Sequence, residues 1–510
     1  MHYNAAADLL GRNHTRSAKV AFFDDHGSYE YGEVARRIDH FAGYLASLNL
    51  PSESRILLCL LDSITFPVAC LATIKAGLVP VMVNPLLPSA DFDYMLWDSR
   101  ARALIVSPSA WPSFARIVSG KPELQYLFVA DGPAPPGTLS FAGSVDQAKP
   151  LLEAAKTRPD EPCLRQYSSG TTGKPKGTIH SHDNVRQLMR LYPSTVLELT
   201  EHDITFSAAK LFFGYGFGNG LVFPMSVGAT SILMAGRPTA QEVWSRLVKH
   251  GPTVFYGVPT LYALLLDSRD APRSDNLSLR LCTSAGEALP KPLAERWKGQ
   301  YETDILDGIG STEMFHIFLS NRPNDIAYGT SGRAVGGYEL RLVGDDGAPV
   351  CPGSIGEIHI KGPTSALGYW CNRKKTSQTF LGSWTRTGDK FLEDENDRYV
   401  YCGRSDDMLK VSGIYVSPIE VETALMSRPS VREAAVVGWA DAEGLIKPNA
   451  FVVVHDGTST DAVLEKVLKS HVKETLAPYK YPRRIEFLSD LPKTPTGKIE
   501  RYKLRRPGPS

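Results

Sequence analysis

We predict an α/β protein with a large N-terminal domain and a small α+β C-terminal domain. Three observations support this fold class. Short apolar runs alternate with helical stretches over about residues 15–130 and again after residue 177. Short β-like runs separated by turns occupy about residues 328–405. A mixed pattern of helices and strands fills the last hundred or so residues. Alternation of the first kind is typical of a parallel sheet covered on both faces. With 510 residues, about three domains, or one large and one small, are expected.

The first region contains a predicted strand, helix and strand in succession. Residues 54–60 are typical of a buried strand, residues 65–76 of a helix and residues 79–83 of the next strand, whereas residues 131–137 are typical of a surface loop. After a glycine-rich segment the alternation resumes, with strands expected at residues 230–234, 253–256 and 279–284.

The last two regions have a different character. Predicted strands at residues 339–343, 357–361 and 399–402 indicate a small barrel or sheet. A boundary near residues 403–407 divides the chain into an N-terminal domain (1–405) and a C-terminal domain (406–510). Beyond it, Ser417-Pro-Ile-Glu420 is typical of a helix start with a capping box. A site shared by the two domains would lie in the cleft between them.

The composition excludes several classes of protein. The 56 basic and 55 acidic residues leave a net charge of +1, so neither nucleic acid nor an anionic membrane is expected as the main partner. A membrane-spanning helix is not expected, because the most apolar region, residues 56–87, contains Asp62, Lys75 and several prolines. A signal peptide is not expected either, because the N-terminus lacks the apolar core of one. Seven scattered cysteines without a C-x-x-C pair are typical of reduced core thiols in a cytoplasmic protein. Twelve histidines without ligand spacing argue against a transition-metal site.

The segment Tyr167-Ser-Ser-Gly-Thr-Thr-Gly-Lys-Pro-Lys-Gly177 indicates polyphosphate binding. Its glycines allow close backbone approach, its hydroxyls can donate hydrogen bonds, and Lys174 and Lys176 supply positive charge. It is not a Walker loop, because Pro175 stands five residues after Gly170 and blocks an immediate helix. We expect an anion nest of amides and hydroxyls. A flexible linker is the alternative, but linkers seldom carry two lysines and a proline in such a run.

Four further segments carry matching chemistry. Residues 307–313 (DGIGSTE) offer glycines, a hydroxyl and a carboxylate, and residues 385–389 (TRTGD) end in an aspartate suited to ribose hydroxyls. Residues 403–413 combine a cation, acids and a lysine, and residues 491–501 present Lys498 on a turn stiffened by proline and glycine. Each has a structural alternative, such as a turn cap, a solvated helix residue or a surface lysine. Five such segments in this order favour a shared site.

In this order, the segments resemble the adenylate-forming superfamily of acyl- and aryl-CoA synthetases, carrier-protein adenylation domains and beetle luciferases. The resemblance covers nearly the whole chain and implies an N-terminal domain of two α/β sheets plus a distorted β-barrel, then a small, mobile α+β C-terminal domain. Residues 62–84, 207–219 and 307–321 are most similar to benzoate-CoA ligases. Arg165 departs from the family pattern, because it stands in a strand that is usually apolar.

The resemblance implies a two-step reaction with ATP, Mg²⁺ and coenzyme A. A carboxylate attacks the α-phosphorus of ATP to give an acyl-adenylate and pyrophosphate, and the thiol of coenzyme A then expels AMP. Because the first step brings two anions together, positioning and cationic stabilisation should dominate.

The resemblance also assigns roles to individual residues. The β- and γ-phosphates would be held by Ser168, Thr171, Thr172 and Lys174. Thr312 would contact the α-phosphate, and Glu313 would ligate Mg²⁺, which favours oxygen. Adenine would be framed by residues 284–287, which include Gly286 and Glu287, together with Asp307 and Gly308, and ribose would be bound by Asp389 and Arg404.

Two poses of the small domain are implied. In the first, Lys498 would bridge the substrate carboxylate and the α-phosphate. The domain would then rotate about Asp406, and Lys410 and Gly413 would enter the site, with Gly413 leaving room for the pantetheine arm.

The acyl pocket can be predicted only in part. Gly214, Tyr215, Gly216 and Gly218 offer one aromatic wall and little side-chain bulk, which suits a flat ring. Ala285, Gly310 and His316 would complete it, with a packed core histidine as the alternative for His316. Benzoate is the expected acid, and hydroxy-, 2-amino- and fluoro-benzoates fit the same description.

Three other functions are alternatives. The nearest is a stand-alone enzyme that loads an aryl group onto a carrier-protein thiol, and the second is a light-emitting oxidation that shares the first step. The third is a catalytically silent nucleotide sensor, against which Lys498, Glu313 and Asp389 argue. A monomer and a homodimer are both compatible with the sequence.

Overall fold

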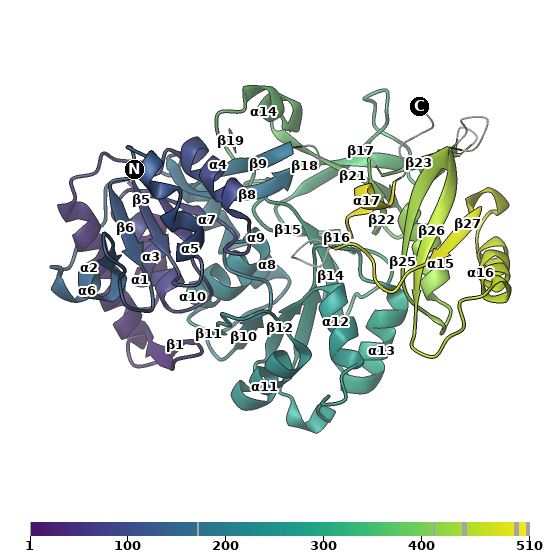
Figure 1. Ribbon diagram of the computed structural model, residues 1–510, viewed down its shortest axis with the longest axis horizontal. Coiled ribbons are helices and arrows are strands. Elements are labelled where there is room, and N and C mark those ends of the chain that lie inside the picture. The colour runs from purple at the N-terminus through teal and green to yellow at the C-terminus, as the bar shows by residue number, and fades with distance from the viewer. Residues whose placement is uncertain are drawn as a thin grey trace.

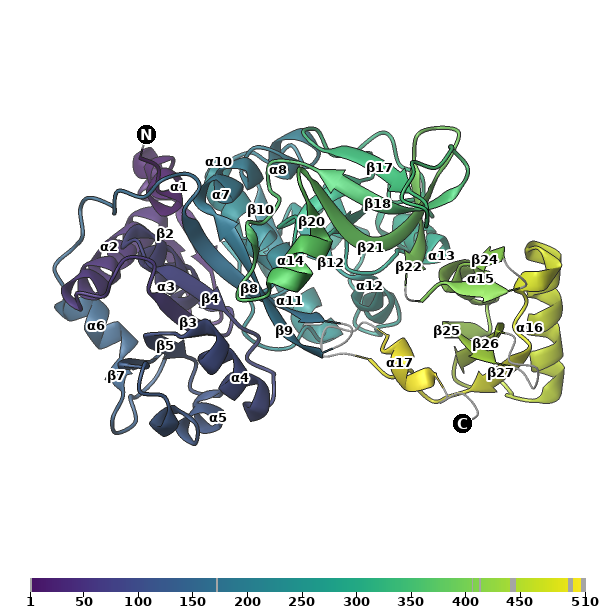
Figure 2. The same cartoon turned by 90° about the horizontal axis from the view of Figure 1, so that it is seen from above.

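A computed structural model describes residues 2–170, 173–405, 407–411, 414–440, 446–493 and 499–505. Within these residues the strands form two large mixed sheets, a five-stranded sheet, a two-stranded ribbon and a three-stranded sheet. Figures 1 and 2 place most of the C-terminal elements, drawn in yellow-green and yellow, at one end of the molecule. The predicted α/β class with a large N-terminal and a small C-terminal part is confirmed.

The first large sheet has nine strands among the described residues, in the order β16-β15-β14-β13-β12-β10-β11-β1-β2. Its strands are β1 (Val20–Phe23), β2 (Ser28–Glu30), β10 (Ile204–Ser207), β11 (Thr230–Ile232), β12 (Val254–Gly257), β13 (Leu281–Ser284), β14 (Ile305–Gly310), β15 (Ile317–Ser320) and β16 (Arg333–Ala334). Strands β11, β10, β12, β13 and β14 pair in parallel, so their carboxyl ends share one edge. The strands expected at residues 230–234, 253–256 and 279–284 are confirmed.

The second large sheet has eight described strands, in the order β19-β9-β8-β4-β3-β5-β6-β7. Its strands are β3 (Arg55–Cys59), β4 (Val79–Met82), β5 (Ala103–Val106), β6 (Tyr126–Val129), β7 (Leu139–Ser140), β8 (Pro162–Gly170), β9 (Gly173–Ser181) and β19 (Gly368–Tyr369). The strand–helix–strand succession predicted over residues 54–83 is confirmed, with α3 (Thr65–Lys75) as its helix.

The helices lie in three layers around these two sheets (Figure 1). The layer between the sheets contains α1 (Ala5–Gly11), α2 (Tyr31–Ser47), α3 and α7 (His182–Leu188), whose buried side chains join those of both sheets in one core. The outer face of the first sheet carries α11 (Ala240–His250), α12 (Pro259–Leu266) and α13 (Lys291–Tyr301). The outer face of the second sheet carries α4 (Ser89–Ser99) and α5 (Trp111–Ala115).

Strand alternation decides which side chains enter which layer. On β12, Val254 and Tyr256 enter the shared core, and Phe255 between them enters the outer core. Helix α11 begins where the Thr239 side chain accepts a hydrogen bond from the Glu242 N–H, and it ends at Gly251, whose φ of 55° suits glycine.

The β-rich region is a five-stranded antiparallel sheet among the described residues. It contains β17 (Glu339–Val343), β18 (Ile355–Lys361), β20 (Phe380–Leu381), β21 (Trp384–Glu393) and β22 (Tyr399–Arg404). All three strands predicted for this region are present. The short helix α14 (Arg373–Thr379) precedes β20.

The C-terminal elements form the predicted α+β unit. Helices α15 (Pro418–Met426) and α16 (Ala462–Thr475) pack on β25 (Val431–Ala440), β26 (Ile446–Val454) and β27 (Arg484–Phe487), while α17 (Arg501–Leu504) lies on the opposite face. The ribbon of β23 (Leu409–Val411) and β24 (Ile414–Val416) leads into α15. Ser417 caps α15 by accepting from the Glu420 N–H at 3.3 Å, but the Glu420 carboxylate binds Lys480 at 2.6 Å, so only half of the predicted capping box has formed.

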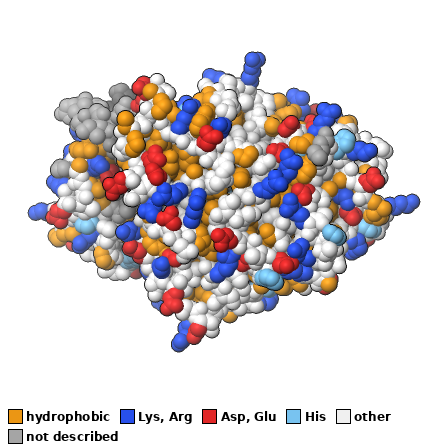
Figure 3. All heavy atoms as spheres, turned by 180° about the vertical axis from the view of Figure 1, so that it is seen from behind, with side chains coloured by type: hydrophobic (Ala, Val, Ile, Leu, Met, Phe, Trp, Pro, Cys, Tyr) orange, Lys and Arg blue, Asp and Glu red, His pale blue; other side chains and the backbone are white. Residues whose placement is uncertain are grey.

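Two expectations from composition can be compared with the structure. The seven cysteines are free, but Cys351 and Cys371 are exposed because both lie in turns between elements, so the expectation that all are core thiols is wrong for these two. Basic and acidic side chains are interspersed over the face in Figure 3, as the balanced charge predicts. Among the described helices, none combines the length and apolarity needed to cross a bilayer.

Candidate functional site

Three of the predicted site segments lie at the carboxyl edge of the first large sheet. Residues 208–213 follow β10, residues 285–287 follow β13 and residues 311–316 follow β14, and these strands are close neighbours in the sheet. Ligands of open α/β sheets bind outside the carboxyl ends of the strands. This edge is therefore where the topology favours a small-molecule site.

The described part of the glycine-rich segment lies in both strands of the antiparallel hairpin β8–β9, in which Ser168 lies opposite Lys176. A strand and not a helix follows it, as Pro175 predicts. The Ser168 Oγ is buried and has no hydrogen-bond partner in the part of the chain that is described. Lys174 Nζ lies 4.8 Å from the centroid of the Tyr94 ring. Thr171 and Thr172 lie outside the described residues.

Glu313 lies beside this hairpin. The Tyr369 hydroxyl donates a hydrogen bond to Glu313 Oε1 at 2.6 Å, and Lys176 Nζ lies 3.8 Å from the same oxygen. The described residues contain no cluster of three or more His, Cys, Asp or Glu that could hold a metal. A single carboxylate beside a phosphate loop fits Mg²⁺, which keeps several waters and binds through one or two carboxylates plus substrate phosphates.

Thr312 is held through its backbone. His180 Nε2–H donates to the Thr312 carbonyl oxygen at 2.8 Å, and the His180 ring stacks on Phe315 with centroids 4.0 Å apart. Burial lowers the pKa of His180 to about 4, so the imidazole is neutral at physiological pH. Since Phe315 has a φ of 67°, this turn is strained, and the stacked histidine supports it.

Of the residues expected around adenine, 285–287 follow β13, whereas Asp307 and Gly308 lie within β14. Ala285 is buried, and Gly286 has a φ of 94°. Asp307 is buried, and burial raises the pKa of its carboxyl well above the usual range. Its Oδ2 accepts from Ser331 Oγ at 3.4 Å, whereas its Oδ1 is buried without a partner among the described residues. A Cβ on Gly308 would lie 3.2 Å from the Leu319 carbonyl oxygen, so the strand is closely packed there.

The residues expected at ribose form a cross-strand pair. Asp389 on β21 lies opposite Arg404 on β22, and Arg404 Nη1 donates to Asp389 Oδ1 at 3.1 Å. Arg404 Nη1 also donates to the Thr387 carbonyl oxygen at 2.9 Å. The strand register thus presents a carboxylate whose orientation is fixed by an adjacent cation.

The residues expected to form the acyl pocket pack closely around helix α9 (Gly214–Phe217). The Tyr215 hydroxyl and Thr283 Oγ1 lie 2.6 Å apart, and His316 Nε2–H donates to the Tyr215 carbonyl oxygen at 3.1 Å. A Cβ on Gly214 would lie 2.6 Å from the Phe315 carbonyl oxygen, and one on Gly310 would lie 2.5 Å from that of His316. Glycine is therefore required sterically at both positions.

His316 has the environment of a core residue. It is 2 % exposed, and its ring centroid lies 4.6 Å from that of Phe223 and 5.5 Å from that of Tyr215. Burial lowers its pKa to about 3, so it is neutral. This environment favours the packed alternative, in which His316 supports the Tyr215 backbone from behind.

The C-terminal residues of the prediction are only partly described. Asp406, Gly413 and Lys498 lie outside the described residues, and Lys410 lies on β23 with its side chain not described. The next residue after Lys498, Ile499, donates its backbone N–H to Glu287 Oε1 at 3.3 Å. This contact joins the C-terminal segment to the carboxyl edge of the first sheet.

Sequence reasoning missed two residues that contact the site. His180 could have been found, because Lys176, Thr178 and His180 alternate along β9 and alternate residues share a face. Tyr369 carries no such signal, since it reaches Glu313 only because β19 pairs with β9.

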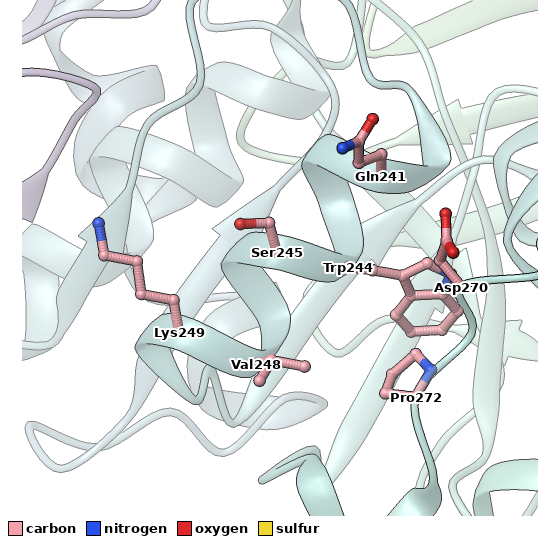
Figure 4. Close-up of a pocket in the computed structure, with 7 residues that line it drawn as sticks. All are labelled: Gln241, Trp244, Ser245, Val248, Lys249, Asp270 and Pro272. Carbon is pink, nitrogen blue, oxygen red and sulfur yellow. The ribbon is translucent and has the colours of Figure 1, made fainter.

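A separate hollow of about 550 Å³ opens on the outer surface of α11 (Figure 4). Trp244 and Lys249 of α11 and Asp270 after α12 line it. None of the predicted site residues that the structure describes borders this hollow, so it has no part in the candidate site.

Comparisons with known proteins agree with this geometry. The family described as AMP-binding enzyme matches residues 11–370, and the family described as AMP-binding enzyme C-terminal domain matches residues 420–498. A benzoate–CoA ligase of Thauera aromatica is 54 % identical over 507 residues, which cover 99 % of this chain and 96 % of that protein.

Two solved structures are similar over the whole chain. A benzoate CoA ligase from Burkholderia xenovorans LB400 has a TM-score of 0.93 at 49 % identity, covering 99 % of this chain and 100 % of that one. The anthranilate CoA ligase AuaEII in complex with anthranoyl-AMP has a TM-score of 0.93 at 42 % identity, covering 99 % and 96 %.

Proposed function

This chain belongs to the family of AMP-binding enzymes, and on that premise we propose that it is an AMP-forming aryl-CoA ligase. It activates an aromatic carboxylate, benzoate or a benzoate with a hydroxyl or amino substituent, with ATP to an aryl-adenylate and pyrophosphate. It then transfers the aryl group to coenzyme A and releases AMP. The observation that carries this proposal is the full-length similarity to a benzoate–CoA ligase.

The first half-reaction depends on positioning. The hairpin β8–β9, with Ser168 and Lys174, holds the β- and γ-phosphates, and Asp389 with Arg404 orients the ribose. Thr312 contacts the α-phosphate, and Lys498 neutralises the two oxyanions that approach each other. Loss of one such charged contact typically costs a factor of about 10² to 10³ in rate.

Glu313 would hold Mg²⁺, which would supply charge neutralisation at the phosphates. The chain's own residues keep that carboxylate in place, because Tyr369 donates to Glu313 Oε1 at 2.6 Å. The adjoining turn is fixed by the hydrogen bond of 2.8 Å from His180 Nε2–H to the Thr312 carbonyl oxygen.

The acid lies against the backbone of α9. Gly214 and Gly310 allow close packing of the backbone there, and Tyr215 is held in place by its contact with Thr283 at 2.6 Å. A ring that slides between backbone and an aromatic wall buries its apolar surface without a large side chain opposing it. In the second half-reaction, Lys410 and Gly413 take part after the small domain has rotated about Asp406.

The test is pyrophosphate release against a panel of substituted benzoates and medium- and long-chain fatty acids, with and without coenzyme A. We expect strong release with benzoate and formation of free aryl-CoA when coenzyme A is the only acceptor. Faster turnover of a long fatty acid than of benzoate contradicts the acyl-pocket assignment. Adenylation without aryl-CoA formation favours a carrier-protein acceptor instead.

A further inference from the structure

Lys176, Glu313 and Tyr369 form a cluster that the proposed reaction uses only in part. Lys176 Nζ lies 3.8 Å from Glu313 Oε1, the oxygen that also accepts from the Tyr369 hydroxyl at 2.6 Å. Lys176 Nζ in turn lies 3.5 Å from the Tyr369 oxygen and 4.7 Å from the centroid of its ring. The ammonium therefore stands beside the carboxylate that is expected to bind the metal.

The backbone around this cluster is fixed by strand pairing. Tyr369 on β19 pairs with Thr178 on β9, two residues after Lys176. The Ala366 N–H donates to the Glu313 carbonyl oxygen at 2.9 Å, which ties the segment before β19 to the Glu313 turn. Strand pairing and this hydrogen bond thus hold the backbone that carries the three side chains.

The Lys176–Glu313 pair is loose compared with the ion pairs that hold the fold. Arg501 approaches Glu422 to 2.8 Å and Arg280 approaches Asp203 to 2.8 Å, both with direct hydrogen bonds. In the Lys176–Glu313 pair the distance is 3.8 Å, and the side chains keep 20 % and 18 % of their surfaces exposed. A divalent cation at closer range interacts more strongly with the carboxylate, because Coulomb energy rises with charge and falls with distance.

The neighbours of Lys176 favour a polyanion. Ser168 lies opposite Lys176 in the hairpin, and its buried Oγ has no partner among the described residues. The cations Lys375 and Arg404 also act on Lys176 electrostatically, so positive charge accumulates around it. Glu313 is thus the carboxylate that faces Lys176, whereas Arg404 pairs with Asp389.

We propose that Lys176 is a placeholder cation, which neutralises Glu313 in the nucleotide-free enzyme and yields that place to a divalent metal when ATP binds. Tyr369 keeps the carboxylate in position throughout, and the released ammonium turns to the phosphates. This inference rests on the proposed function. It gives Lys174 and Lys176, the two lysines of the glycine-rich segment, different roles.

The test measures ATP binding by equilibrium dialysis, without any carboxylic acid so that no turnover occurs. Each protein is titrated with ATP in EDTA and again in saturating Mg²⁺, and the ratio of the two dissociation constants gives the Mg²⁺ enhancement. For K176M we expect metal-free ATP to bind about tenfold more weakly, because a cation is lost. We also expect its Mg²⁺ enhancement to be at least about threefold greater than in the wild type, because the competitor for Glu313 is gone.

Lys174 provides the matched control, because its ammonium contacts the Tyr94 ring. K174M should weaken ATP binding but leave the Mg²⁺ enhancement at the wild-type value. K176R keeps the charge and should restore the wild-type enhancement within about twofold, which separates the effect from misfolding. In an E313Q background, K176M should no longer change the enhancement.

Two outcomes overturn the inference and can be told apart. If K176M shows a Mg²⁺ enhancement equal to or below that of the wild type, the metal does not replace Lys176 beside Glu313. ATP binding would then still support the proposed function. If the wild-type protein binds no ATP under either condition, the proposed function fails and the inference fails with it.

Discussion

The backbone N–H of Ile499 donates a hydrogen bond to Glu287 Oε1 at 3.3 Å, across a sequence separation of 212 residues. Glu287 follows β13 at the carboxyl edge of the first sheet, and Ile499 directly follows Lys498 in the chain. The contact therefore ties the segment that carries the proposed catalytic lysine to the residues proposed to frame adenine. We propose that it stabilises the pose required for adenylation.

Removal of this acceptor should disfavour the adenylating pose selectively. We expect E287A to slow pyrophosphate release about tenfold or more, because a hydrogen bond to a charged group contributes about 1.5–3 kcal/mol. Thioester formation from supplied aryl-adenylate should change little. E287Q retains an acceptor oxygen and should recover most of the lost rate, and equal losses in both half-reactions would argue against a pose-specific contact.

Lys498 should be needed for one half-reaction only. We expect K498A to reduce adenylate formation by a factor of about 10² to 10³, because an ammonium between two oxyanions is lost. Coenzyme A should still react with supplied aryl-adenylate at near the wild-type rate. K466A, an exposed lysine on α16, serves as control and should leave both rates unchanged. An equal fall in both rates for K498A contradicts the two-pose assignment.

The fold was predictable where the pattern is local. The apolar run 54–60 and the helical stretch 65–76 correspond to β3 (Arg55–Cys59) and α3 (Thr65–Lys75), because a buried strand and a buried helix each have their own period and length. Strand order was not predictable. Strand β1 lies beside β11, about two hundred residues later, and only packing of the intervening layers decides such a pairing.

The site was predictable as a set of segments but not as a set of contacts. The motifs identified Glu313 and Asp389 as carboxylates of interest. The local sequence does not show, however, that Lys176 lies beside Glu313 and that Lys174 does not. That choice depends on the hairpin β8–β9 and on β19, which brings Tyr369 to the same oxygen. His316 is the opposite case. Its place in a motif predicted a part in the acyl pocket, but its ring is packed against aromatic rings.

Asp389 should determine recognition of the ribose. We expect the wild type to prefer ATP over 2′- or 3′-deoxy-ATP by about tenfold or more in kcat/KM, because the carboxylate loses a charge-assisted hydrogen bond with the analogue. D389N should bind ATP more weakly and lose most of that preference. The turn residue Asp394, whose side chain accepts from the Asn396 and Arg398 N–H groups at 2.9 Å, offers the control D394N. Undiminished discrimination in D389N places the ribose elsewhere.

Gly310 should be intolerant of a side chain. A Cβ there would lie 2.5 Å from the His316 carbonyl oxygen, so the backbone beneath the acyl pocket has to move. We expect G310A to lower kcat/KM for benzoate about tenfold or more. On the exposed face of α13, a Cβ on Gly299 would meet none of the described atoms within 4 Å, so G299A should keep full activity and gain up to about 1 kcal/mol in stability. Full activity of G310A with benzoate would show that the pocket lies elsewhere.

His180 should make the protein sensitive to acid. Its folded-state pKa is lowered to about 4, mainly by burial, whereas an unfolded histidine titrates near its ordinary value of about 6.5. Between these values the unfolded chain binds more protons, so stability rises with pH in this window and is lost as the pH falls through it. At about 1.4 kcal/mol per pKa unit, the contribution is about 3 kcal/mol between pH 7 and pH 4. In urea titrations over this range, H180Q should lose that much less free energy of unfolding than the wild type. The exposed His455 provides the control H455Q, which should follow the wild type. Parallel pH profiles for the wild type and H180Q would show that the His180 imidazole is not held neutral in the fold.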